Sequence, residues 1–154
     1  MSEIYFDNGA TTRALPQVRE IMDEVLEKEY GNPSSMHMKG FDAEKYVNHA
    51  KEIIAKSLKV DPKEIFFTSG GTESNNMAII GTAMANKRKG NKIITTSVEH
   101  SSVLATMKYL EEQGFEVIYL PVDRYGVVQM EALEKEMTED TILVSTMYVN
   151  NEVG

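Results

Sequence analysis

The second part of the chain alternates between short apolar, β-prone runs and longer segments with helical periodicity. The apolar runs predict strands at about 64–68, 92–97, 115–120 and 141–149. The segments that separate them predict helices at about 72–88, 101–113 and 129–138. Strands that alternate with helices form parallel sheets, because each helix carries the chain back across the sheet. The pattern therefore predicts an α/β fold, with a mainly parallel sheet and covering helices.

The first part of the chain has a different pattern. Apolar residues recur at helical spacing over 15–26, and Pro16 suits the first turn of that helix. The Gly-Asn-Pro-Ser-Ser sequence at 31–35 ends it, and a long amphipathic helix follows over about 43–58. Residues 4–6 are consistent with either a short strand or an extended arm.

Composition and charge exclude several classes of function. The chain has 154 residues and a net charge of −8, which disfavours nucleic acid and anionic membranes as partners. Its apolar runs are far shorter than the ~20 residues of a membrane span, and the first residues lack the features of a signal peptide. The absence of cysteine excludes disulfides and thiolate metal sites. We therefore expect a cytoplasmic protein with no metal site.

The Ser-Gly-Gly-Thr turn at 69–72 is the first candidate site. It separates a predicted strand from a predicted helix, so its backbone N–H groups and the Thr72 hydroxyl would surround a helix N-terminus, where a phosphate binds well. The alternative is a structural turn in which Ser69 or Thr72 caps the helix. Neither a Walker sequence nor a Gly-x-Gly-x-x-Gly fingerprint is present.

Two further polar clusters follow predicted strands, namely 99–102 and 150–152. If the strands are parallel, all three clusters lie at the carboxyl edge of the sheet, where ligands bind in open α/β folds. His100 is either a structural helix cap or a functional imidazole that stacks on a ligand or moves protons. The Asn150–Asn151 pair offers amide donors, although such pairs often serve turns. For His37 the choice between a structural and a functional role is open in the same way. His49 lies within a helical pattern and is expected to be structural.

Taken together, these segments resemble the start of cysteine desulfurases of the NifS/IscS type, which are pyridoxal-phosphate enzymes of fold type I and aminotransferase class V. The resemblance covers essentially the whole chain. Five ordered motifs carry it: Tyr5–Thr12, Gly31–His37, Thr68–Asn76, Val98–His100 and Val149–Gly154.

The resemblance implies a role for four residues. Gly71 and Thr72 would bind the phosphate of pyridoxal 5'-phosphate, although relatives more often have Ala before the Thr. His100 would stack on the pyridine ring and assist proton transfer, and Asn151 would donate to the phenolic oxygen. The complete enzyme would convert L-cysteine to L-alanine and pass the sulfur to its own cysteine, then to an acceptor or scaffold protein for iron–sulfur cluster or thiolation pathways. It would be a homodimer.

The chain departs from this family in what it lacks. It contains neither the His-Lys pair that supplies the Schiff-base lysine nor the nucleophilic cysteine. We therefore expect an N-terminal fragment that is inactive alone and does not bind the cofactor covalently. Residues 1–30 would be an arm and helix, and 31–154 the start of the large cofactor-binding domain. The alternatives are a fragment of another class V aminotransferase and a non-enzymatic domain that binds a phosphate-bearing ligand.

Overall fold

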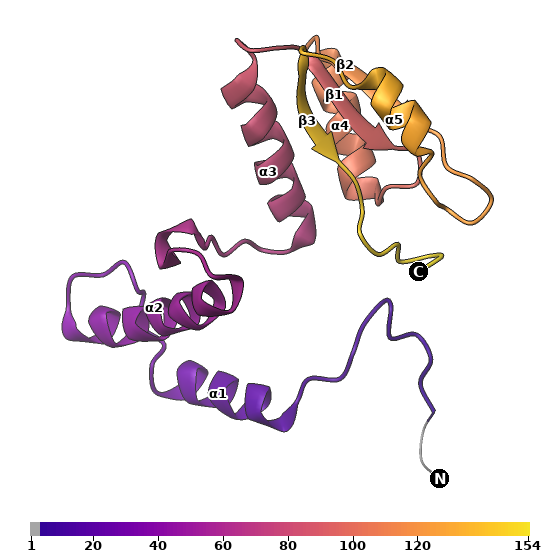
Figure 1. The fold of residues 1–154 in the computed structure, drawn as a ribbon. Coiled ribbons are helices and arrows are strands. Elements are labelled where there is room, and N and C mark those ends of the chain that lie inside the picture. The colour runs from indigo at the N-terminus through magenta and orange to yellow at the C-terminus, as the bar shows by residue number, and fades with distance from the viewer. Residues whose placement is uncertain (1–3) are drawn as a thin grey trace. The chain divides into compact units, whose positions relative to one another are not determined.

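The computed structural model describes residues 4–154, which form two compact units that meet at Phe67 and Thr68. Figure 1 shows the helical first unit in indigo and magenta, and the mixed second unit in pink to yellow. The family-based division at residue 30 stays a prediction. Within residues 4–154, no helix combines the length and apolar character needed to cross a membrane.

The first unit consists of helices, as the sequence predicts. Helix α1 (Pro16–Glu27) has Pro16 in its first turn, and helix α2 (Met38–Leu58) starts five residues earlier than predicted. Residues 4–7 have no regular structure, consistent with the extended arm. Gly40 lies against the turn at 31–35, since a Cβ there would meet the carbonyl oxygen of Ser35 at 2.3 Å. Glycine thus permits the close contact between this turn and α2.

The predicted strand at 64–68 is wrong. A short 3₁₀ helix, η1 (Pro62–Glu64), is followed by residues without regular structure, and Phe66 and Phe67 are 70% and 53% exposed. A strand exists only where its backbone groups pair with a neighbour. The three-stranded sheet of the described residues pairs no strand with this segment, so its apolar character alone does not make it β-structure.

The second unit is built on a parallel three-stranded sheet. It contains β1 (Lys92–Thr96), β2 (Glu116–Leu120) and β3 (Thr141–Ser145) in the order β2-β1-β3. Both neighbours pair parallel to β1, with an irregular register between β1 and β3 near Lys92. The mainly parallel sheet predicted from the sequence is therefore confirmed.

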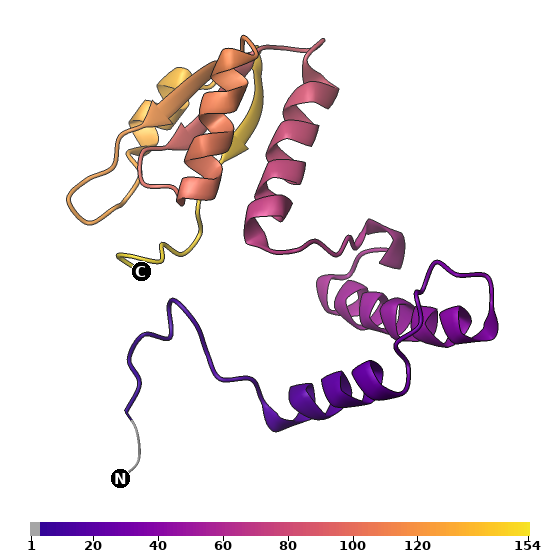
Figure 2. The same cartoon turned by 180° about the vertical axis from the view of Figure 1, so that it is seen from behind.

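Three helices connect and cover these strands. They are α3 (Gly71–Asn86), α4 (Ser101–Glu112) and α5 (Met130–Glu136), each close to its predicted range. Helices α4 and α5 lie on opposite faces of the sheet, as the two views in Figures 1 and 2 show. Helix α3 packs against α4 and β3. The covering helices predicted from periodicity are thus confirmed.

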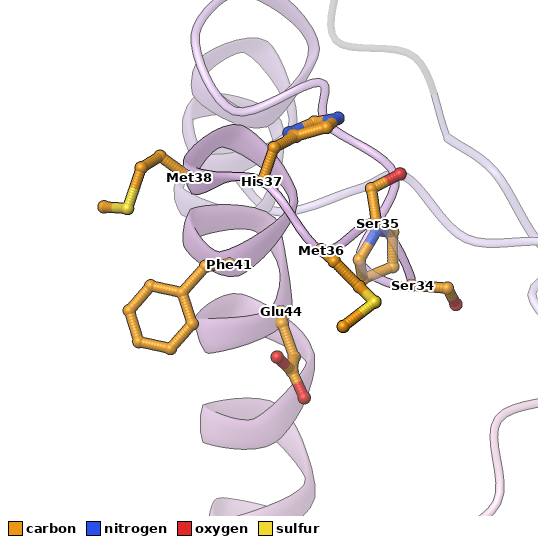
Figure 3. A pocket seen from close by; sticks show the side chains of 8 residues that line it. Ser34, Ser35, Met36, His37, Met38, Phe41 and Glu44 are labelled. Atoms are coloured by element: carbon orange, nitrogen blue, oxygen red, sulfur yellow. The ribbon is translucent and has the colours of Figure 1, made fainter.

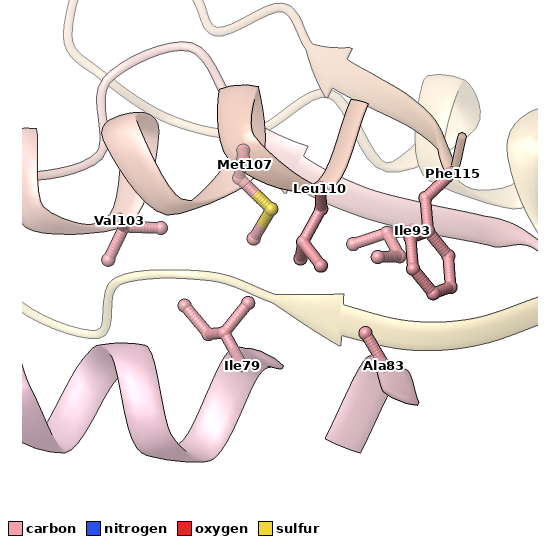
Figure 4. Close-up of a cluster of buried hydrophobic side chains, with 7 residues drawn as sticks. All are labelled: Ile79, Ala83, Ile93, Val103, Met107, Leu110 and Phe115. Atoms are coloured by element: carbon pink, nitrogen blue, oxygen red, sulfur yellow. The ribbon is translucent and has the colours of Figure 1, made fainter. Parts of the chain in front are cut away.

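One hydrophobic core joins the sheet to α3 and α4. Figure 4 shows that α3 and α4 direct apolar side chains toward Ile93 of β1 and toward Phe115, which precedes β2. The cluster comprises Ile79, Ala83, Ile93, Val103, Met107, Leu110 and Phe115. Burying a large side chain of this kind contributes roughly 1.5–3 kcal/mol, so this core fixes the N-terminus of α4 relative to the sheet.

Strand β3 is shorter than the sequence predicts. The apolar run at 141–149 continues to Val149, but the strand ends at Ser145. The backbone N–H of Met147 donates to Oε1 of Glu99 at 2.8 Å. Because a side chain takes this donor, the backbone leaves the sheet there, and residues 146–150 cross toward the end of β1.

Candidate functional site

The N-terminus of α3 is open to an anion. Gly70 is its N-cap residue and supplies no side chain, so Ser69 and Thr72 do not cap the helix as the structural alternative required. The N–H groups of Gly71, Thr72 and Glu73 have no intrahelical acceptor, because the first N–H groups of any helix lack one. Gly71 and Thr72 are exposed, and a Cβ added at Gly70 or Gly71 would meet nothing within 4 Å. The turn can therefore receive a ligand from outside.

Glu73 is held away from the free N–H groups of this turn. Its Oε2 accepts hydrogen bonds from the N–H of Ser69 at 2.6 Å and from the Ser69 hydroxyl at 2.7 Å. These two bonds, the backbone one first, lower the pKa of the Glu73 carboxyl. A carboxylate near a helix N-terminus is itself favourable, so Glu73 stabilises the turn without occupying the anion position.

His100 is the N-cap residue of α4. Its Nδ1 accepts the backbone N–H of Ser102 at 3.1 Å and lies 2.8 Å from the Ser102 hydroxyl. Both alternatives raised by the sequence are therefore compatible: one ring nitrogen caps the helix, and the other, Nε2, makes no hydrogen bond with any residue of 4–154. His100 as a residue is exposed.

Polar contacts join the start of α4 to the first turns of α3. Asn75 Nδ2 donates to the Ser102 hydroxyl at 2.9 Å. One turn further along α4, the Thr106 hydroxyl lies 2.8 Å from Asn76 Oδ1. Thr106 and Ser102 are buried, so these bonds fix the relative position of the two helix N-termini. The site residues on α3 and His100 are thereby brought to the same end of the helix pair.

A buried carboxylate fastens the segment after β3 to the end of β1. Glu99 is 7% exposed, and its Oε1 accepts from the Thr96 hydroxyl and from the N–H of Met147, both at 2.8 Å. Asn150 adds a second fastening, because its Nδ2 donates to the carbonyl oxygen of Val98 at 2.9 Å. The residues that follow β3 therefore lie beside those that lead to His100.

Asn150 and Asn151 have different surroundings. Asn150 Oδ1 also accepts the N–H groups of Glu152 and Val153, so its amide is fully engaged in the turn. Asn151 is exposed, and its side chain contacts only the neighbouring Glu152 carboxylate, at 3.1 Å, among the described residues. A pocket of about 370 Å³ beside these residues is lined by Val98, Glu99, Asn150 and the loop after β2, without Asn151 or His100.

The structure brings together some of the predicted site. His100 and Asn151 follow parallel strands and lie at the carboxyl edge of the sheet. Gly71 and Thr72 follow no strand, and reach the same end through the contacts between α3 and α4. A common ligand for all four remains a prediction.

His37 and the pocket beside it belong to the first unit. His37 is the N-cap residue of α2, and its Nδ1 accepts the N–H of Gly40 at 3.2 Å. Figure 3 shows its ring beside serine, methionine and phenylalanine side chains, which line a pocket of about 690 Å³. His49 is exposed on α2. The geometry gives His37 a capping role in this unit.

Three residues important for the geometry had no assigned role in the sequence. Glu99 and Ser102 lie within the cluster at 99–102, and Asn75 lies within the motif at 68–76, but their contacts join residues 27 to 48 positions apart. Only Ser102 carried a local signal, since small polar residues are common in the first turn of a helix.

The aminotransferase class-V family matches residues 4–154, and the chain belongs to this family. Its curated relatives include proteins named cysteine desulfurase IscS. The one from Clostridium botulinum (strain Hall) is 48% identical over 152 residues, covering 99% of this chain and 38% of the relative. The one from Dictyoglomus turgidum is 49% identical and is covered to 39%.

Solved structures give the same result. A NifS-like protein matches with a TM-score of 0.93 and 50% identity, over 99% of this chain and 42% of its own. A protein described as SspA in complex with cysteine matches with a TM-score of 0.88 and 38% identity. The chain therefore spans about two-fifths of the length of these relatives, and its fold is that of the cysteine desulfurases.

Proposed function

We propose that this chain contributes part of the cofactor site of a cysteine desulfurase that uses pyridoxal 5'-phosphate. The observation that carries the proposal is the uncapped N-terminus of α3, joined through Asn75 and Ser102 to His100. It supplies free N–H donors and a hydroxyl at one position and an exposed imidazole on the neighbouring helix. That combination suits a flat ligand that carries a phosphate.

Each residue then has a distinct role. The N–H groups of Gly71 and Thr72, with the Thr72 hydroxyl, bind the phosphate, since charge-assisted hydrogen bonds to phosphate are strong. His100 stacks on the pyridine ring, and the Asn151 amide donates to the phenolic oxygen. The cofactor, when bound, supplies the electron sink for the chemistry at the substrate.

The remaining reacting groups lie outside these 154 residues. The chain contains no cysteine and no histidine followed directly by lysine. We therefore expect it to be inactive alone and to hold the cofactor without a covalent bond. In the complete enzyme, L-cysteine would lose its sulfur to a cysteine thiol, which becomes a persulfide, and the substrate would leave as L-alanine.

The partners follow from this activity. L-cysteine is the proposed substrate, and a sulfur-acceptor or scaffold protein for iron–sulfur cluster or thiolation pathways receives the sulfur. We also propose that the complete protein is a cytoplasmic homodimer. The bound cysteine named for the SspA structure supports the choice of substrate.

The test is the reaction of the complete protein with L-cysteine. We expect equal amounts of alanine and of protein-bound or released sulfur, and no dependence on a keto acid. Transfer of the amino group to a keto acid, with cysteine left intact, would instead establish another class V aminotransferase. Binding of phosphate-bearing ligands with neither reaction would establish the non-enzymatic alternative.

A further inference from the structure

Three side chains form a continuous hydrogen-bonded chain that runs from α3 to His100. Asn75 Nδ2 lies 2.9 Å from the Ser102 hydroxyl, which lies 2.8 Å from His100 Nδ1. The backbone N–H of Ser102 also donates to Nδ1, at 3.1 Å. The imidazole is thus held from one side by two groups of the same residue.

The hydrogen bonds that link Asn75, Ser102 and His100 have a fixed direction. An amide NH₂ group can only donate, so the Ser102 oxygen accepts from Asn75. The single hydroxyl proton of Ser102 is then free to donate to His100 Nδ1, as the backbone N–H does. Because Nδ1 faces two donors, it carries a lone pair, and a neutral imidazole then has its proton on Nε2.

The N-terminus of α4 also favours the Nε2–H form of His100. His100 is the N-cap residue of α4, so Nδ1 lies among the N–H groups at the positive end of that helix. A lone pair is favoured there over an N–H group. Neutral histidines at helix N-termini act as hydrogen-bond donors rather than bases in other enzymes.

We propose that Asn75 and Ser102 are positioning residues that hold neutral His100 in its Nε2–H form. The exposed nitrogen then presents a donor N–H to a ligand, and it has no lone pair with which to take a proton. In the context of the proposed function, on which this part rests, His100 contributes stacking, a hydrogen bond and an N–H proton that it can give to the substrate.

The tautomer is directly measurable without a cofactor. In the ¹⁵N-labelled 154-residue chain at about pH 8.5, where ordinary histidines are neutral, long-range ¹⁵N–¹H correlations show which nitrogen carries the proton. His37 is an internal reference, because its Nδ1 accepts one backbone N–H and has no such hydroxyl. We expect the Nε2–H form to predominate at His100. The ratio of the Nε2–H to the Nδ1–H form should be about fivefold higher there than at His37, the effect of one hydrogen bond.

Two variants test the positioning residues. Ser102→Ala removes the hydroxyl but keeps the backbone N–H. The ratio of the Nε2–H to the Nδ1–H form at His100 should therefore fall about fivefold, to the ratio at His37. Asn75→Asp, of nearly the same shape, accepts the hydroxyl proton of Ser102 and should lower the preference similarly. Ser101→Ala, an exposed neighbour, is the matched control and should leave it unchanged.

A predominant Nδ1–H form at His100, or a ratio unaffected by both variants, would overturn the proposal. Neither result depends on whether the complete protein desulfurates cysteine, so this test and that of the proposed function fail separately.

Discussion

At the scale of single residues, Thr72 gives the most direct test of the phosphate position. Its hydroxyl makes no hydrogen bond with the described residues, so Thr72→Val removes a potential ligand contact and little else. We expect the complete protein to bind pyridoxal phosphate about 10- to 100-fold more weakly, because one charge-assisted hydrogen bond contributes roughly 1.5–3 kcal/mol. Equilibrium titration of the apoprotein measures this.

Thr82→Val is the matched control for that substitution. Thr82 lies on the same helix, ten residues beyond Thr72, and its carbonyl oxygen accepts the Asn86 side chain independently of its hydroxyl. The Thr82→Val variant should bind pyridoxal phosphate as tightly as the parent protein does. Equal dissociation constants for Thr72→Val and the parent would show that the hydroxyl does not contact the phosphate.

Glu73 gives a second prediction, on the pH dependence of stability. Its folded-state pKa is lowered by the two bonds from Ser69, so its stabilising effect is complete above the ordinary carboxyl pKa of 4.5 and is lost as pH falls through the lower folded value. We expect Glu73→Gln to be less stable than the parent at neutral pH. Below pH 4.5 the difference should shrink, as urea unfolding at both pH values would show. A constant difference would contradict the prediction.

The site residues differ in how far the sequence could predict them. Gly71, Thr72 and His100 follow apolar runs directly, and the resemblance assigned them without any structure. The hydrogen bonds that place them, from Asn75 to Ser102 and from Met147 to Glu99, join distant positions with no local pattern. Such contacts depend on the packing of α3, α4 and β3, so only coordinates reveal them.

At the scale of elements, Glu99 holds the segment after β3 against the end of β1. Glu99→Ala leaves the Thr96 hydroxyl and the Met147 N–H without their acceptor, at a cost of about 2–3 kcal/mol. Glu99→Gln keeps an oxygen at the position of Oε1 and should lose less. Unfolding in urea measures both, and hydrogen exchange should show faster exchange of the Met147 amide in the alanine variant.

The exposed Glu112, near the end of α4, provides the control, since its alanine variant removes a carboxylate from the surface. If Glu112→Ala and Glu99→Ala were equally stable, the hydrogen bonds of Glu99 would not contribute as the geometry indicates.

The elements themselves were predicted well where periodicity was long. Helices α1, α3 and α4 lie within two residues of their predicted bounds, because an apolar stripe of three or more turns is hard to mistake. The start of α2 differs from its predicted position by five residues. Strands were less certain, since a short apolar run does not reveal its partner. The run at 64–68 has none in the sheet, and that at 141–149 loses its pairing where Glu99 takes the Met147 N–H.

At the scale of the whole molecule, the described chain exposes an unusual amount of apolar surface. Phe66 and Phe67 are exposed, as are the N-cap residue Leu15 and several apolar residues of α1: Val18, Ile21, Met22 and Leu26. Strands β2 and β3 each pair on one side only in the sheet of residues 4–154. Open strand edges and uncovered apolar faces promote association.

We therefore expect the 154-residue chain to self-associate in solution. Sedimentation at increasing concentration should show species larger than the monomer, and Phe66→Ser with Phe67→Ser should reduce them. Tyr125→Ser, on an exposed loop, is the comparison variant and should have little effect. A chain that stays monomeric at every concentration would contradict this expectation.

The strand order β2-β1-β3 has one further consequence. The chain leaves β1 in one direction to form β2, then returns across β1 to form β3 on its other side. The carboxyl ends of β1 and β3 therefore lie side by side, and open α/β folds bind their ligands beyond the carboxyl ends of their strands. His100 and Asn151 follow these two strands, and the loop after β2 lies beside them, where it lines a pocket with Val98, Glu99 and Asn150. Variation in length and sequence should therefore be tolerated least at 97–100 and 146–151.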